Sequence, residues 1–343
     1  MAPKHVNSSV VDSAGAAGSG DRERFDRAVA PLRRELHAHC YRMLGSVHDA
    51  DDALQEGLLR AWRAYDRFEG RSSLRTWLYT VVTRTCLDAA KARSRRALPI
   101  DLGPSSAEPA VDAIPTDDVP WLTPYPDPAD SAQRAEHVEL AFIAAMQHLS
   151  GNERAAILLT DVLGFSAADA AAVMSTTPTS MHSALARARR TLAGVDLTAT
   201  GVADSRPSPS TLALAHRFAD ALATSDLQAF IGLLAPQVTW QMPPLHEWYA
   251  GAEAVASFAH AVPMTLCPSW RTEVLTANGQ PAIAFYLGTQ SEAPHEAWSL
   301  TVLTVEDQRI TAITSFLDPD LFARFQLPVQ LPRSEDLSRH PAP

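Results

Sequence analysis

The spacing of apolar residues changes along this 343-residue chain, and the change restricts its fold class. Residues 21–96 and 131–193 repeat apolar side chains at intervals of three and four, which predicts amphipathic helices. From residue 208 two more helices are predicted, and then short runs alternate apolar with polar residues, which predicts strands. We therefore expect a multidomain protein in which two all-α domains precede an α+β domain.

Composition places the boundaries between these domains. Residues 98–130 are acidic and proline-rich, and they contain "VPWLTPYPDP", an aromatic patch suited to anchoring an otherwise disordered linker on a surface. Residues 1–20 are rich in serine, glycine and alanine and are predicted to be disordered. The predicted organisation is a leader at 1–20, helical domains at 21–97 and 131–195, the linker at 98–130, the α+β domain at 208–327 and a loose tail at 328–343.

Charge is distributed unevenly. The formal net charge is −10, yet residues 71–96 hold seven Lys or Arg residues against one acid, Asp88. Residues 97–140 hold nine acids against one Arg. Cations concentrated in one part of an acidic chain are typical of a nucleic-acid contact.

The basic segment includes a predicted helix, "TWLYTVVTRTCLDAAKARSRR" at 76–96. Its helical period places Trp77, Arg84, Asp88 and Lys91 nearly on one line. A line of cations beginning at an aromatic residue suits a nucleic-acid backbone and one unstacked base. A solvated basic face beside a core tryptophan is the alternative interpretation.

The second helical domain ends in a pattern typical of a helix-turn-helix. Ser150 with Glu153 fits a capping box, and Thr177 with Pro178 fits the start of the last helix. That helix has an apolar side formed by Met181, Leu185, Ala188 and Leu192. Its other side is polar and basic, which favours DNA contact over a plain helical hairpin.

Other features exclude several classes of protein. The three cysteines, Cys40, Cys86 and Cys267, show no C-x-x-C spacing, which argues for a reducing cytoplasm and against a disulfide framework or a zinc site. No apolar run reaches the roughly 18–20 residues of a membrane span, and the start lacks the apolar core of a signal peptide. We predict no metal and no cofactor.

The helical domains resemble the sigma-70 family of bacterial transcription initiation factors. The resemblance rests on "YRMLGSVHDADDALQEGLLRAWRAYDRFEGRSSLRTWLYTVVTRTCLDAAKARSRR" and "LSGNERAAILLTDVLGFSAADAAAVMSTTPTSMHSALARARRTL". Their spacing is similar to the extracytoplasmic-function (ECF) group, which keeps conserved regions 2 and 4. The C-terminal part resembles SnoaL-like domains of the nuclear-transport-factor-2 fold, through "WYAG" at 248–251 and the strand order. "VPWLTPYPDP" is most similar to the linker of the SigG-type group.

The resemblance implies roles for three sets of residues. An acidic helix face would dock on the clamp helices of the polymerase β′ subunit: Asp49, Asp52, Gln55 and Glu56. Contacts with the −10 element and its flipped base would come from Arg71, Ser73, Arg75, Trp77, Arg84, Asp88 and Lys91. The −35 major groove would be read by Thr179, Ser180, His182, Ser183 and Arg187. Pro178 and His182 stand where related factors usually carry a small residue and Asn, so no −35 preference is carried over.

The SnoaL-like fold implies a conical pocket in the C-terminal domain. Candidate lining residues are Trp240, His246, Trp248, Tyr286, Trp298, Phe316 and Asp318. The spacing of His246, Glu247 and Asp318 fits no specific reaction, and core aromatics with surface polar residues are the alternative interpretation. We assign no catalytic residue.

These observations predict a cytoplasmic sigma factor rather than an enzyme. The expected partners are the bacterial RNA polymerase core (β′ clamp helices and β flap), promoter DNA, and a small-molecule ligand or protein regulator of the C-terminal domain, with no membrane. The C-terminal domain would modulate activity. Two alternatives stay open: a helix-turn-helix regulator without polymerase docking, and a DNA-binding module fused to a SnoaL-like enzyme.

Overall fold

The chain folds into two units. The computed structural model describes residues 21–92, 95–116, 118–127, 139–193 and 207–332. One unit comprises the chain up to Arg93 together with Leu149–Thr191, and we call it the helical unit. The other comprises Ser94–His148 and the chain from Leu192 onward, and we call it the sheet unit. Each unit is described by itself.

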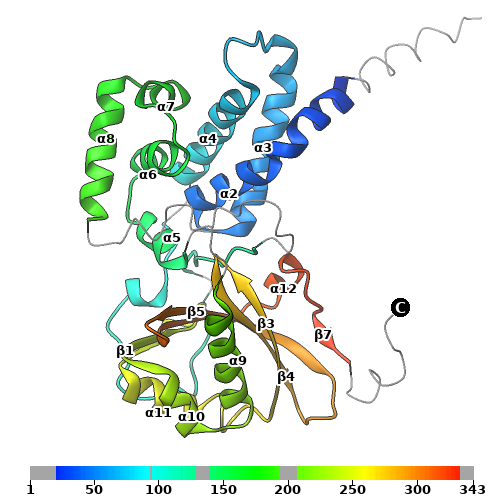
Figure 1. Ribbon diagram of the computed structural model, residues 1–343, viewed down its shortest axis with the longest axis vertical. Helices are drawn as coiled ribbons and strands as arrows, with labels where there is room; N and C mark the ends of the chain where they lie inside the picture. Colours follow the sequence, from blue (N-terminus) through cyan, green and yellow to red (C-terminus); the bar gives the residue numbers. More distant parts are fainter. Residues whose placement is uncertain (1–20, 93–94, 117, 128–138, 194–206, 333–343) are drawn as a thin grey trace, which may run out of the picture. The chain divides into compact units, whose positions relative to one another are not determined.

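The helical unit contains the first helices of the chain (Figure 1). Residues 21–29 are helical, and the named helices that follow are α2 (Arg33–Leu44), α3 (Val47–Ala64), α4 (Leu74–Ala92), α6 (Gly151–Ile157), α7 (Ala167–Val173) and α8 (Pro178–Thr191). A π turn, Leu158–Val162, follows α6 directly. The helices predicted from the apolar period are confirmed over these residues.

Local sequence explains where these helices begin and end. Gly45 ends α2 in the left-handed conformation at φ 70°, which glycine adopts without a side-chain clash. Ser46 then caps α3 by accepting a hydrogen bond from the Asp49 backbone N–H. Ser150 and Glu153 form the predicted capping box of α6, and Ser166 caps α7.

Helices α2, α3 and α4 pack around one core. The predicted apolar stripe of α3 is buried, with Ala50 and Ala61 fully inaccessible. Gly57 lets α4 approach closely, because a Cβ there would lie 3.1 Å from Val82 Cγ2. In the same interior the imidazole Nε2 of His39 on α2 lies 2.9 Å from Thr83 Oγ1 on α4.

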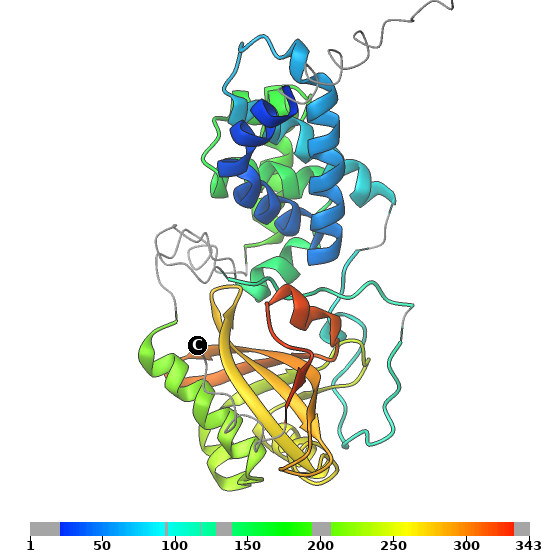
Figure 2. The same cartoon turned by 90° about the vertical axis from the view of Figure 1, so that its right-hand side faces the viewer.

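The sheet unit combines helices with one curved sheet (Figure 2). Its helices are α5 (Leu140–Met146), α9 (Pro209–Ala223), α10 (Leu227–Leu233), α11 (Ala252–Ala261) and α12 (Asp320–Arg324). Its strands are β1 (Leu234–Gln241), β2 (Trp248–Ala250), β3 (Ser269–Ala277), β4 (Gln280–Gly288), β5 (His295–Glu306), β6 (Arg309–Phe316) and β7 (Gln330–Leu331).

The strand order is β2-β1-β6-β5-β4-β3, with β7 paired to β5. Most neighbouring strands are antiparallel, but β1 and β6 are parallel, with Trp240 opposite Ile313. At this pair β6 returns to β1 from far along the chain. Local alternation of side chains carries no information about such a long-range pairing.

Side chains leave the sheet on alternate faces and form two cores. One face of β4 presents Ile283 and Phe285 to the main core, which includes Phe218 of α9 and Phe258 of α11. The opposite face presents Ala284 and Tyr286 to a smaller core with Phe322 of α12. The sheet is therefore covered on both faces.

The linker is part of the sheet unit. Leu122 is 1% exposed, and Pro126 forms an antiparallel bridge with Ala277 at the end of β3. The Tyr125 N–H donates to Asn278 Oδ1 at 2.8 Å, and the Asn278 N–H donates to the Tyr125 carbonyl at 2.9 Å. The predicted anchoring through "VPWLTPYPDP" is thus confirmed, while the disorder predicted around it is not found over the described part of the linker.

No helix within the described ranges combines the length and the apolar character that crossing a bilayer would require.

Candidate nucleic-acid interface

Helix α8 presents a polar face to solvent. Thr177 begins the helix by accepting a hydrogen bond from the Ser180 N–H at 3.2 Å. The apolar side packs inward, and Met181, Leu185, Ala188 and Leu192 are all buried. The five residues predicted to read the −35 element are all exposed: Thr179, Ser180, His182, Ser183 and Arg187. Such an exposed polar face after a tight turn is what major-groove reading by a helix-turn-helix requires.

Two residues of that face have partners in this conformation. Arg187 donates through Nε to Glu153 Oε1 at 2.7 Å, and this bond, with the smaller contributions of Ser150, lowers the pKa of Glu153. The Ser183 hydroxyl donates to the Thr179 carbonyl one turn earlier, at 3.0 Å. Glu153 therefore occupies the Nε donor of Arg187 in this conformation, while the side chain stays exposed.

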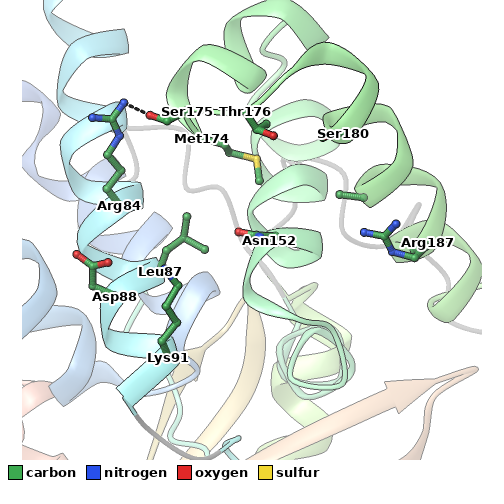
Figure 3. Close-up of a pocket in the computed structure, with 11 residues that line it drawn as sticks. Arg84, Leu87, Asp88, Lys91, Asn152, Met174, Ser175, Thr176, Ser180 and Arg187 are labelled. Carbon is green, nitrogen blue, oxygen red and sulfur yellow. Dashed lines mark hydrogen bonds between the residues drawn. The ribbon is translucent and has the colours of Figure 1, made fainter.

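A groove of about 520 Å³ separates α4 from α8 within the helical unit (Figure 3). Arg84, Asp88 and Lys91 line one side, in the order that the helical period of the sequence predicts. Ser180 and Arg187 line the other. The groove therefore contains three cations and one carboxylate, which favours an anionic ligand such as a phosphate backbone.

Sequence reasoning missed the residues that connect the two sides of this groove. Ser175, in the turn before α8, accepts a hydrogen bond from Arg84. It has a positive φ of 51°, and Asn152 and Thr176 line the groove beside it. The turn "STTPTS" was the available indication, but nothing local to it predicts a contact with a helix 91 residues away.

Arg75 is held by contacts within the helical unit, although its side chain is 38% exposed. Its Nε and Nη2 donate to the Glu35 carboxylate at 3.0 and 3.1 Å, and its guanidinium lies 4.9 Å from the centre of the Tyr79 ring. The centre of the Phe165 ring lies 5.6 Å from the same guanidinium. In this conformation Arg75 joins α4 to Glu35 on α2.

The remaining residues predicted for the −10 element lie near the start of α4. Ser73 caps the helix by accepting a hydrogen bond from the Thr76 N–H at 3.0 Å. Arg71 is exposed, and its Nε lies 3.2 Å from Glu69 Oε2. Trp77 is half-buried against Phe68, with ring centroids 5.0 Å apart. An aromatic surface that is partly accessible is suited to stacking with an unpaired base.

The acidic face of α3 is only partly exposed. Asp52 and Gln55 are exposed, and Glu56 is intermediate. Asp49 is 7% exposed, so it contributes little to a docking surface in this conformation. Glu56 accepts from Arg60 Nε at 2.7 Å, which raises the pKa of Arg60, and Arg60 also reaches Asp88 on α4 at 3.3 Å.

The sheet unit contains an apolar cavity of about 310 Å³. Of the residues predicted to line a pocket, Trp240 and Trp298 do so. Tyr286 faces the smaller core on the other side of the sheet, where burial and, less strongly, Glu273 raise its pKa to about 12. Phe316 is buried, and Asp318 accepts from the Asp320 N–H at the start of α12.

The other two predicted residues contact the linker instead. Trp248 donates through Nε1 to the Gly103 carbonyl at 2.9 Å. The His246 ring lies 5.7 Å from the Trp121 ring, edge to face. The described residues also contain no group of three or more His, Cys, Asp or Glu side chains placed to hold a metal ion.

Three family models match the chain. Sigma-70 region 2 matches residues 28–96, sigma-70 region 4 matches 139–192, and a SnoaL-like domain matches 215–313. The first two matches contain α4 and α8, which line the groove, and the third contains most of the cavity.

Similar proteins share this organisation over most of their length. The ECF RNA polymerase sigma factor SigG of Mycobacterium tuberculosis is 41% identical over 322 residues, covering 90% of this chain and 85% of that protein. SigJ of the same organism is 25% identical over 319 residues, covering 90% and 96%. The crystal structure of SigJ has the same fold, with a TM-score of 0.56 at 21% identity over 87% of this chain and 98% of that one.

Because both sigma-70 regions match and SigG aligns with 90% of this chain, the chain belongs to the ECF family of RNA polymerase sigma factors, in the form that carries a SnoaL-like domain.

Proposed function

We propose that this chain binds bacterial core RNA polymerase, directs it to promoters through −10 and −35 contacts, and uses its SnoaL-like domain to modulate that activity. The observation that carries the proposal is the exposed polar face of α8, in a chain that also presents Asp52 and Gln55 outward on α3. A DNA-binding repressor requires the first surface but not the second. SigG and SigJ are named as RNA polymerase sigma factors, which supports docking on polymerase here as well.

The role proposed for each surface follows from the chemistry of its residues. Cations Arg84 and Lys91 would follow a strand backbone, and Trp77 would stack with a flipped base, which stabilises melted DNA without any catalytic group. The face of α8 would read base edges. A net charge of −10 disfavours DNA binding by the free chain, so promoter recognition would depend on polymerase.

Run-off transcription tests the proposal directly. Purified core polymerase is combined with a library of promoter fragments and with wild-type protein, Asp52→Arg, or the control Asp220→Arg, which reverses an exposed charge on α9 of the sheet unit. We expect promoter-specific transcripts from wild type and Asp220→Arg, and their loss with Asp52→Arg. Sequence-specific DNA retention without any transcript would instead favour the repressor.

The SnoaL-like domain is proposed to regulate rather than to catalyse. Cys267 is the one ionisable residue among the described residues that line its cavity, and burial raises the pKa of that thiol to about 11. A neutral thiol without an adjacent base is a poor nucleophile. Comparing transcription from the full chain with that from a chain ending at Ala199 tests regulation, and equal activity with an equal promoter range would reject it.

A further inference from the structure

The linker forms part of the wall of the apolar cavity. Ala110, Val111, Ala113 and Pro115 line it together with Trp240, Phe258 and Phe285 of the main core. We call residues 106–116 the linker strap. The cavity is therefore built from two parts of the chain that are more than 100 residues apart.

Hydrogen bonds hold the linker strap at both ends. On one side the Ser106 N–H donates to the Trp248 carbonyl at 2.7 Å, and the Ala110 N–H donates to the Tyr249 hydroxyl at 2.9 Å. At the other end the Thr116 N–H donates to the Pro244 carbonyl at 3.0 Å. Between these points Ile114 is 81% exposed, so the middle of the strap is packed loosely. Such a segment can move without disrupting the sheet.

The cavity wall contains an unused hydrogen-bond donor. Trp240 donates through Nε1 to Ser315 Oγ at 3.0 Å, and Ser315 Oγ lies 2.9 Å from Thr301 Oγ1. The two hydroxyls have two protons, and the bond between them uses one. The other proton has no acceptor within the described part of the chain. A buried donor of this kind favours a ligand that supplies an acceptor.

The rest of the wall restricts the ligand further. Aromatic and aliphatic side chains dominate, and the described lining residues include no Asp, Glu, His, Lys or Arg. A charged ligand would therefore lose its hydration without gaining an ion pair. The volume of about 310 Å³ admits a molecule of roughly ten to twenty non-hydrogen atoms.

We infer that the cavity binds a neutral, largely apolar small molecule with a hydrogen-bond acceptor such as a ketone or an ester, and that the linker strap closes over it. The remaining hydroxyl proton of the Ser315–Thr301 pair donates to the acceptor, and the aromatic wall surrounds the apolar body. Because the strap forms part of the wall, ligand binding stabilises the strap in the position seen here. This inference gives a ligand class to the proposed regulatory domain, but it concerns binding alone and does not depend on polymerase docking.

The probe for the test is prodan, a neutral naphthalene ketone whose emission shifts to the blue in apolar surroundings. We expect saturable binding of one prodan per full-length chain. Laurdan, the same fluorophore with a long acyl chain, tests the size limit, and anilinonaphthalene sulfonate tests the exclusion of charge. Equal binding of all three, or no saturable binding of prodan, would overturn the inference.

Matched variants locate the site. Ala113→Trp places a large ring against the core at the cavity mouth, whereas Ile114→Trp changes the neighbouring exposed residue. We expect the first to abolish prodan binding and the second to leave it unchanged. Thr301→Val with Ser315→Ala should weaken binding about tenfold, because the acceptor then loses its hydroxyl donor. Wild-type affinity in Ala113→Trp would place the probe elsewhere.

Hydrogen exchange tests the closing of the strap. If the ligand lies beneath the strap, exchange of the Ala110 and Thr116 amides should slow by about 100-fold at a prodan concentration of 100 times its dissociation constant. Amides of β3 outside the strap provide the internal control. Prodan binding without slower exchange at Ala110 and Thr116 would leave the cavity as a ligand site but refute its coupling to the linker. A transcription failure would bear only on the polymerase proposal.

Discussion

His39 is fully buried in the helical unit, and its imidazole is neutral there. Burial, followed by the nearby charges of Arg42 and Arg75, lowers the pKa of His39 from 6.5 to about 3. The ring lies edge to face with Tyr79 at 5.2 Å and bonds Thr83 through Nε2. One side chain thus joins α2 to α4 in its uncharged form.

This neutral histidine predicts a pH-dependent stability. As the pH falls from 6.5 towards 3, the unfolded chain binds a proton at His39 and the folded chain does not. The free energy of unfolding should therefore fall with decreasing pH, by up to about 1.4 kcal/mol per pH unit from this group. His39→Gln keeps a polar contact with Thr83 but lacks the proton site. The free energy of unfolding that urea denaturation gives for this variant should therefore depend less steeply on pH across that window. His182→Gln, on the exposed face of α8, controls for the loss of a histidine. The same dependence of the free energy of unfolding on pH in wild type and in His39→Gln would contradict the argument.

Single residues also show what the sequence alone could not predict. The exposed set on α8 follows from helical period, because one face is apolar and the other is not. Arg75 lies in the same kind of pattern, yet Glu35, 40 residues earlier, holds it. Asp49 has the spacing of an acidic surface residue but is buried in the first turn of α3. Partners of a charged residue are set by tertiary packing, which local spacing does not encode.

At the scale of elements, α8 depends on its first turn. Thr177 supplies the side-chain acceptor there, and the turn carries Thr179, Ser180 and His182 of the proposed −35 surface. Thr177→Ala should cost about 1 kcal/mol of helix stability and reduce promoter-specific transcription by up to about fivefold. Thr177→Ser keeps the hydroxyl and should retain activity. Run-off transcription measures the effect, and wild-type activity in Thr177→Ala would show that the turn is held by other contacts.

Helices and strands that local sequence determines were predicted better than the way in which they pair and pack. The helix starts at Ser150 and Thr177 follow from capping chemistry and are found as expected. Strand β1 follows from alternation, but its parallel partner β6 does not, because the pairing closes a loop of about 70 residues. The groove between α4 and α8 likewise joins elements separated by the whole linker.

At the scale of the molecule, the linker is bound by the SnoaL-like domain, which lies beyond region 4 in the sequence. Asn278, at φ 55°, turns from β3 to β4 and accepts from the Tyr125 N–H. Asn278→Gly keeps that backbone conformation and removes the acceptor, a loss of about 1 kcal/mol. We expect the Tyr125 amide to exchange about fivefold faster, and transcription to rise if the domain restrains the linker.

The control for this variant is Asp307→Gly, which makes the same kind of change at φ 47° in the exposed turn between β5 and β6. It should leave both the exchange of Tyr125 and transcription unaltered. Unchanged exchange in Asn278→Gly would mean that the bond to Tyr125 contributes nothing to holding the linker.

The division of the chain into units has a consequence for exchanging parts between relatives. Ser94–His148 belongs with the chain from Leu192 onward, although region 4 stands between them in the sequence. A chimera joined only after region 4 would therefore pair a linker from one parent with a strap-binding surface from another. A chimera that keeps the sheet unit intact must take both Ser94–His148 and the chain from Leu192 onward from the same parent. Leu149–Thr191 can then come from the other parent. The segments that must be exchanged together are therefore not contiguous in the sequence.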